Sequence, residues 1–233
     1  MLWIAAAETL ISLITLAARF VVCLRRIHHH RVSKMEPELE SLVSELTESL
    51  RLKKKPRVIV SDVSIGPAVM GVFRHLIVLP KCLVTSALNL RPILAHELLH
   101  IRRGDVWVAA LQAAVRCLWW FHPAVWAANK MLSHETERCC DEQVIRELNC
   151  SPGKYARSLL AVIESKHRLK HVPIFPGMKS VEITSDRMER IMSLKHGSYQ
   201  PIRWWSGALL ALFAFVVLPG ADPPPAMTPL SKW

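Results

Sequence analysis

The sequence predicts a mainly helical α+β domain with a small antiparallel β-sheet, anchored in a membrane by a helix at each end. Three observations predict this: an apolar run near each end of the 233 residues, helical spacing of apolar residues through most of the chain between them, and one stretch rich in Val and Ile. The chain is 51% hydrophobic and still carries 30 Lys and Arg. Apolar and basic residues are therefore segregated along it.

The first apolar run, residues 2–24, is long enough for one membrane-spanning helix. In a secretory signal peptide, the basic residues precede the apolar run. Here they follow it, as Arg25, Arg26, Arg31 and Lys34. Because positive charge marks the cytoplasmic end of such a helix, we expect the domain that follows to lie in the cytoplasm. Residues 1–27 are assigned to this transmembrane helix and its basic collar.

The net charge of +11 has two interpretations, nucleic-acid binding or contact with a membrane surface. Much of the basic charge lies in residues 25–34 and 51–57, beside or soon after the first apolar run. This position favours the lipid bilayer as a partner, and no direct contact with nucleic acid is expected. The six cysteines have no regular spacing, which favours a reducing compartment. We expect Cys139 and Cys140 to pack in the core rather than bind a metal.

One amphipathic helix and three short strands are predicted between residues 38 and 80. Apolar residues recur at helical spacing over 38–52. Three Val- and Ile-rich segments follow, separated by glycine and proline: 57–60, 68–73 and 76–79. We expect them to form a small antiparallel sheet. Its edge either holds an extended peptide by backbone pairing or only supports the helix that follows.

That helix contains a His-Glu-x-x-His pattern within residues 93–105. His96 and His100 are four residues apart and therefore lie on one face of the helix. Two neutral imidazoles at this spacing reach one tetrahedral Zn²⁺, and Glu97 beside them can take a proton from a zinc-bound water. So short a pattern also occurs by chance, and the alternative is a helix with two half-exposed histidines.

Residues 106–132 are apolar enough to span a membrane, but Arg116 and the pair His122-Pro123 interrupt them. If this stretch crossed the bilayer once, the acidic residues after it would lie on the opposite side from the two histidines. We therefore expect either a helical hairpin that enters the bilayer and returns, or two helices packed into the core and partly sunk in the bilayer.

A long helix is predicted over residues 123–148, and Glu137 and Asp141 lie four residues apart on one face of it. One of them can be a metal ligand and the other an acceptor that holds a ligand histidine by its free ring nitrogen. A solvated helix face is the alternative explanation for such a pair.

The last part of the chain is expected to contain two more helices and a second transmembrane helix. The two helices are predicted over residues 153–166 and 185–194. A second apolar run follows, with Arg203 and paired Trp residues at its start. The rest of the chain is thus expected to comprise a domain over 28–200, a transmembrane helix over 201–219 and a proline-rich tail over 220–233.

Several motifs, in the same order along the chain, resemble the BlaR/MecR-type membrane zinc peptidases, an antirepressor family related to the gluzincins. The resemblance covers about residues 58–160. The motifs that carry it are Gly66-Pro67 through Leu79-Pro80, the block 94–105, Trp120-Phe121-His122-Pro123, the run 137–142, and Tyr155-Ala156.

The resemblance implies a zincin-like peptidase domain between transmembrane helices, with the catalytic Zn²⁺ bound by His96, His100 and Glu137. Asp141 would then support a ligand histidine. Glu135 is the alternative third ligand, but no aspartate follows it four residues later. Glu97 would be the catalytic base.

The resemblance also implies an integral membrane zinc endopeptidase whose site faces the cytoplasm. Its substrate would be a cytosolic or membrane protein, such as a transcriptional repressor, cleaved in signal transduction. The chain differs from the best-known members because no penicillin-binding sensor domain follows residue 219, so recognition of β-lactams is not expected. The alternative functions are a catalytically idle membrane scaffold that retains the zinc fold and, ranked last, a basic nucleic-acid binder.

Overall fold

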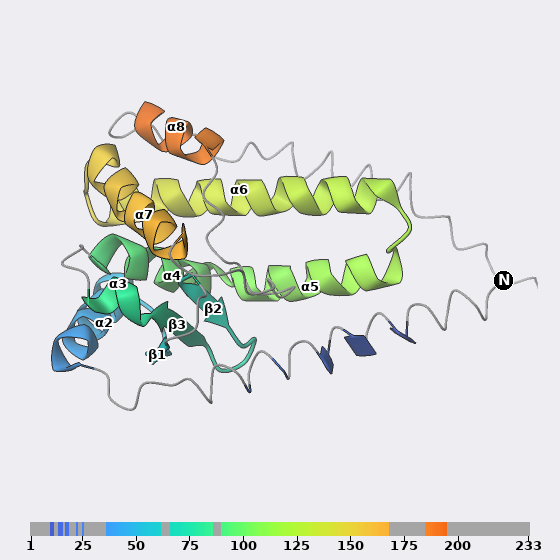
Figure 1. The fold of residues 1–233 in the computed structure, drawn as a ribbon, viewed down its shortest axis with the longest axis horizontal. Coiled ribbons are helices and arrows are strands. Elements are labelled where there is room, and N and C mark those ends of the chain that lie inside the picture. Colours follow the sequence, from blue (N-terminus) through green and yellow to red (C-terminus); the bar gives the residue numbers. More distant parts are fainter. Residues whose placement is uncertain are drawn as a thin grey trace, which may run out of the picture. The chain divides into compact units, whose positions relative to one another are not determined.

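The computed structural model describes residues 36–61, 66–85, 90–167 and 185–194, with scattered residues between 10 and 25. The fold is mostly helical with one small sheet, as the sequence predicts (Figure 1). Its elements, in chain order, are α2 (Pro37–Ser49), β1 (Arg57–Ser61), β2 (Ala68–Met70), β3 (Leu76–Pro80), α3 (Lys81–Thr85), α4 (Leu90–Arg103), α5 (Asp105–Leu118), α6 (Pro123–Glu147), α7 (Pro152–His167) and α8 (Ser185–Ser193).

The sheet is mixed, which corrects the prediction of an antiparallel sheet. β3 lies in the middle, antiparallel to β2 and parallel to β1. Ile77, Val78 and Leu79 of β3 are completely buried, whereas β1 starts at an exposed residue. The most apolar strand therefore takes the central position. β1 pairs only with β3, and that pair is parallel. The β2–β3 hairpin is therefore the only antiparallel pair among the described strands.

The hairpin turn explains why β2 is shorter than predicted. The strand expected over 68–73 ends at Met70, and Gly71 follows it with a φ of +84°. A Cβ atom at Gly71 would lie 2.3 Å from the carbonyl oxygen of Arg74, so no other residue fits this turn without a shift of the backbone.

α4 is the central helix of the fold. Every residue from Pro92 to His100 is buried, and Leu94, Ala95, Leu98 and Leu99 join a core shared with α2, the sheet, α6, α7 and α8. Each leucine buried in this way contributes about 1.5–3 kcal/mol. The polar residues of this stretch are therefore buried as well: His96, Glu97 and His100.

α5 and α6 form an antiparallel pair of helices that leaves the core and returns to it (Figure 1). Gly104, with a φ of +73°, separates α4 from α5, and a turn over residues 119–122 reverses the chain. Gln112 of α5 donates a hydrogen bond to the carbonyl oxygen of Asn129 on α6, at 3.4 Å. The second half of α6 then packs on α4, and this brings Glu137 and Asp141 to the two histidines.

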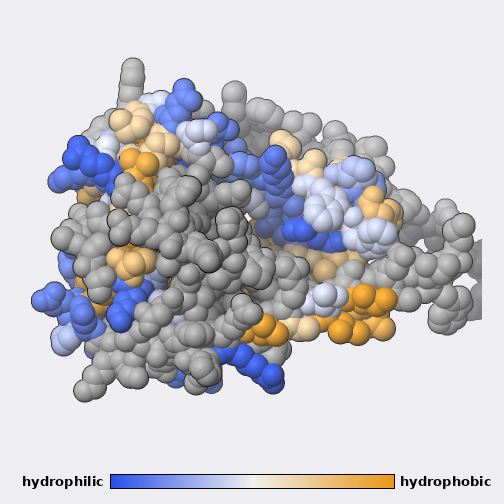
Figure 2. Space-filling model, in the orientation of Figure 1, coloured by the Kyte–Doolittle hydropathy of each residue, from blue (hydrophilic) through white to orange (hydrophobic). Residues whose placement is uncertain are grey.

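The outer part of this helical pair exposes apolar and aromatic side chains. Figure 2 shows hydrophobic residues over α5 on the face drawn. No helix within the described ranges is both long enough and apolar enough to cross a membrane. The exposed side chains are Trp107, Leu111, Leu118, Trp119, Trp120, Phe121, Trp126, Met131 and Leu132.

The predicted transmembrane helices lie outside this description. The segment 1–27 is described only at scattered residues between 10 and 25, and the segments 201–219 and 220–233 fall entirely outside the described residues.

Candidate functional site

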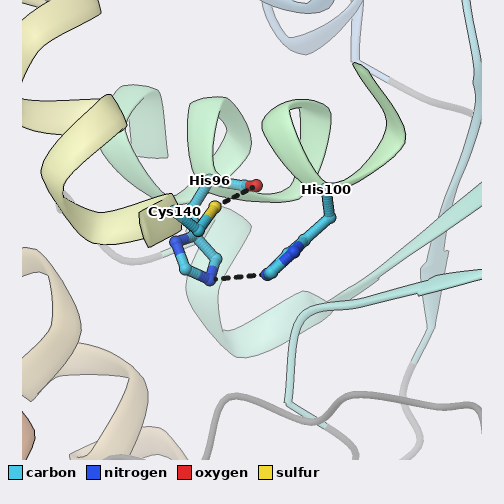
Figure 3. A group of neighbouring side chains, drawn as sticks. All are labelled: His96, His100 and Cys140. Atoms are coloured by element: carbon cyan, nitrogen blue, oxygen red, sulfur yellow. Dashed lines mark hydrogen bonds between the residues drawn. The ribbon is translucent and has the colours of Figure 1, made fainter. Parts of the chain in front are cut away.

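His96 and His100 meet in the interior of the fold, on the side of α4 that faces α6. Their Nε2 atoms are 3.0 Å apart and the rings are nearly perpendicular, at 88° (Figure 3). Only 1% of His96 and 5% of His100 is exposed, so the alternative of half-exposed histidines does not hold.

The hydrogen bonds of the two Nδ1 atoms determine which nitrogen of each neutral ring carries the proton. His100 donates its Nδ1–H to the Asp105 carboxylate at 2.7 Å. Tyr155 donates its single hydroxyl hydrogen to Asp141 at 2.6 Å, so His96 Nδ1–H donates to the Tyr155 oxygen at 2.9 Å. In the neutral form of each ring, the Nε2 atom is therefore left with its lone pair, and the two lone pairs converge. This is the arrangement in which histidines bind a metal ion.

Glu137 completes a set of three donors. Its Oε2 lies 3.4 Å from Nε2 of His96, and its Oε1 lies 3.6 Å from Nε2 of His100. Ligand atoms around a tetrahedral Zn²⁺ are about 3.3 Å apart when each metal–ligand distance is about 2.0–2.1 Å. Glu135, the alternative in the sequence, lies at the surface and pairs with Arg138 at 3.8 Å.

Cys140 is a second candidate donor on α6, which sequence reasoning assigned to packing. Its sulfur and one ligand atom from each histidine lie within 4.8 Å of one another (Figure 3). The thiol donates to the backbone carbonyl of His96 at 3.4 Å. Burial raises the pKa of Cys140, but the two imidazoles lower it to about 7. The site thus offers a carboxylate and a sulfur as third donors.

Glu97 is buried in the same cluster, with 1% of its surface exposed. Among the described residues, neither of its carboxylate oxygens has a hydrogen-bond partner. Burial raises the pKa of Glu97, while the two histidines lower it. A buried carboxylate without partners lowers the stability of the fold. A catalytic role therefore explains Glu97 better than a packing role does.

Two further residues hold the histidines through their Nδ1 atoms. Asp105, the first residue of α5, accepts the hydrogen bond from His100. Tyr155 contacts His96 on its Nδ1 side, away from the converging Nε2 atoms. Asp141, predicted to hold a ligand histidine, lies 3.4 Å from the same Nδ1 atom and also accepts from Tyr155.

Sequence reasoning missed Arg187 of α8 altogether. Its guanidinium donates two hydrogen bonds to Asp141, at 2.8 and 2.6 Å, and forms an ion pair with Glu137 at 3.0 Å. The available signal was its position: Arg187 precedes Ile191 by four residues and so lies on the apolar face of α8, where a charged residue is unusual.

The electrostatics of the cluster favour a cation between the histidines. Burial lowers the pKa of both imidazoles, but their negative neighbours outweigh it, raising the pKa of His96 to about 9 and that of His100 well above its ordinary value. Carboxylates outnumber guanidinium groups around the two rings, with Glu97, Asp105, Glu137 and Asp141 against Arg103 and Arg187.

Comparison with known proteins agrees with a peptidase site. The sequence model of the family described as BlaR1 peptidase M56 matches residues 1–194. The Regulatory protein BlaR1 of Bacillus licheniformis is 32% identical over 133 residues, which cover 56% of this chain and 22% of that protein. The Methicillin resistance mecR1 proteins of Staphylococcus aureus and Staphylococcus epidermidis are 29% identical over 107 residues, 44% of this chain and 18% of theirs. The matched part is thus about a fifth of each relative's length.

Proposed function

This chain belongs to the BlaR1 peptidase M56 family, and on that premise we propose that it is a membrane-bound zinc metalloendopeptidase. One observation carries the proposal: a buried carboxylate without hydrogen-bond partners, Glu97, lies beside two histidines whose Nε2 lone pairs converge with Glu137. A protein that used the metal only for structure has no need of Glu97 at this position.

His96, His100 and Glu137 would hold the Zn²⁺, and the donor chemistry fits that ion because catalytic zinc sites combine imidazole and carboxylate ligands. When bound, Zn²⁺ lowers the pKa of a coordinated water and polarises the scissile carbonyl. Glu97 accepts the proton of the attacking water and delivers it to the leaving amine nitrogen. Asp105 and Tyr155 keep each histidine in the tautomer that presents Nε2.

We favour Glu137 over Cys140 as the third ligand. Each carboxylate oxygen of Glu137 lies near one Nε2 atom, whereas the Cys140 thiol already donates to the backbone of His96. A site that used both residues would have four protein ligands, and catalytic zinc sites keep one position open for water.

The proposed setting is a cell membrane, with the site on the cytoplasmic side. The exposed aromatic and aliphatic side chains of the α5–α6 pair and the two predicted transmembrane helices support this setting. The proposed role is regulated proteolysis of a cytosolic or membrane protein, such as inactivation of a transcriptional repressor. The name of one relative, Regulatory protein BlaR1, agrees with a regulatory role.

The test compares the detergent-solubilised full chain with Glu97→Gln on a peptide library prepared from a bacterial proteome. New peptide termini are counted by mass spectrometry. The parent should generate them, and Glu97→Gln should lose them by a factor of about 10²–10⁴ while keeping its zinc. Glu135→Gln, a surface carboxylate on α6, is the matched control and should cleave like the parent. Equal cleavage by parent and Glu97→Gln, or no cleavage by the zinc-loaded parent, contradicts the proposal.

A further inference from the structure

We propose that Arg187 is a positioning residue of the metal site, which holds the Glu137 carboxylate in the orientation that faces the two histidines. This inference rests on the proposed function only in taking Glu137 as a metal ligand. It concerns a residue of α8, the last described element of the chain, which no sequence motif connects to the site.

The guanidinium contacts three members of the cluster at once. Its Nε and Nη2 atoms donate to the two oxygens of Asp141, at 2.8 and 2.6 Å. Its Nη1 atom lies 3.0 Å from Oε2 of Glu137, and Nη2 also lies 3.4 Å from Nε2 of His96. A planar group held by two parallel hydrogen bonds on one side presents its remaining N–H groups in a fixed direction. Asp141 therefore aims Arg187 at Glu137.

Glu137 needs such support because of its surroundings. It lies four residues before Asp141 on the same face of α6, and two carboxylates at this spacing repel each other. The positive charge of Arg187 contacts both carboxylates, and it pairs with Oε2 of Glu137. The other oxygen, Oε1, is the one 3.6 Å from Nε2 of His100.

α8 holds Arg187 rigidly enough for this task. Ile191, one turn further along, is buried in the main core, and Met188 packs against the same core. α8 contacts both α6 and α7, and only 4% of Arg187 is exposed. The side chain is thus fixed at its base by apolar packing and at its end by Asp141.

The experiment measures the affinity of the full chain for Zn²⁺, by competition with a chelating dye, in Arg187→Gln and Arg187→Lys. We expect a loss of about 10–100-fold for Arg187→Gln, the usual effect of removing a group that orients a metal ligand. Arg187→Lys keeps the charge, and therefore the fold, but one ammonium cannot contact Asp141 and Glu137 in the same geometry. It should still lose several-fold in affinity.

Arg102→Gln is the matched control. Arg102 is a partly buried arginine that pairs with Glu147 at 2.7 Å and donates to the Leu50 carbonyl at 3.1 Å, away from the histidines. Its loss should lower thermal stability and leave zinc affinity unchanged. The visible spectrum of the Co²⁺-loaded protein, which reports ligand geometry, should change in both Arg187 variants and not in Arg102→Gln.

Parental zinc affinity and an unchanged Co²⁺ spectrum in folded Arg187→Lys or Arg187→Gln would overturn the inference. Neither readout uses peptide cleavage. An inactive but zinc-binding parent would therefore refute the peptidase proposal without touching Arg187, and an active enzyme with parental zinc binding in the Arg187 variants would refute only the role of Arg187.

Discussion

The two halves of α6 lie in opposite environments: the inner half buries polar residues beside Val144 and Ile145, and the outer half exposes apolar ones. The half that packs on α4 buries Thr136 and Asp141 and presents Glu137 to the histidines. The half near the turn exposes Trp126 and Met131. One continuous helix thus carries polar groups into the interior and apolar groups to the surface.

The difference indicates two separate functional demands on the same helix. Buried polar groups are costly unless they are paired, and in the inner half Asp141 accepts hydrogen bonds from Tyr155 and Arg187, while Glu137 pairs with Arg187. Exposed apolar surface of this extent marks a contact with a partner or a membrane. We therefore infer that the inner half serves the metal site and that the outer half serves anchoring.

The largest effect is expected from Glu137→Gln, which removes the carboxylate that the inner half supplies. Zinc measured in the purified protein should fall from about one ion per chain to near zero, and cleavage of the peptide library should be lost with it. Cys140→Ser should keep its zinc. Loss of zinc in Cys140→Ser with retention in Glu137→Gln would exchange the roles assigned to these two residues.

A smaller effect is expected from Asp105→Asn, which leaves all proposed ligands in place. The amide no longer fixes the Nδ1–H tautomer of His100, so zinc affinity should fall by about 10–100-fold. Chelator competition measures it, with Asp186→Asn on α8 as the surface control. An Asp105→Asn variant with parental affinity would mean that the 2.7 Å hydrogen bond serves only the fold.

For the outer half, we predict contact with lipid at the turn between α5 and α6. A photo-crosslinking phenylalanine analogue at Phe121, in the full chain reconstituted into vesicles, should give several-fold more lipid adduct than the same analogue at Leu160 of α7. Both side chains are exposed, at 62% and 44%, so exposure alone predicts similar yields. Equal yields would remove the proposed anchoring role of the turn.

The smallest effect is expected at the junction between the central helix and the outer pair. Gly104 has a φ of +73°, and no atom lies within 4 Å of the Cβ that alanine would add. Gly104→Ala should therefore lower stability by about 1 kcal/mol through backbone strain alone. Thermal unfolding in detergent measures it, and Gly153→Ala in α7 is the control that should not destabilise. Equal stability of the two variants would contradict a strained junction.

Local spacing accounts for what the sequence predicted of this site. His96, Glu97 and His100 follow from helical periodicity, as does the pairing of Glu137 with Asp141, because residues four apart share a helix face. The contacts of Tyr155 and Arg187 depend on how α7 and α8 pack on α4 and α6, and no local pattern encodes that packing. The parallel pairing of β1 with β3 was not predicted for the same reason, since it depends on which strand takes the central position.

The most direct test of the central claim is X-ray absorption at the zinc edge of the purified full chain. Our account predicts only nitrogen and oxygen ligands, at about 2.0–2.1 Å, from His96, His100, Glu137 and a water. The spectrum should be unchanged in Glu97→Gln, which keeps every ligand. A sulfur ligand at about 2.3 Å would place Cys140 on the metal and contradict the assignment of Glu137 as the third ligand of an open catalytic site.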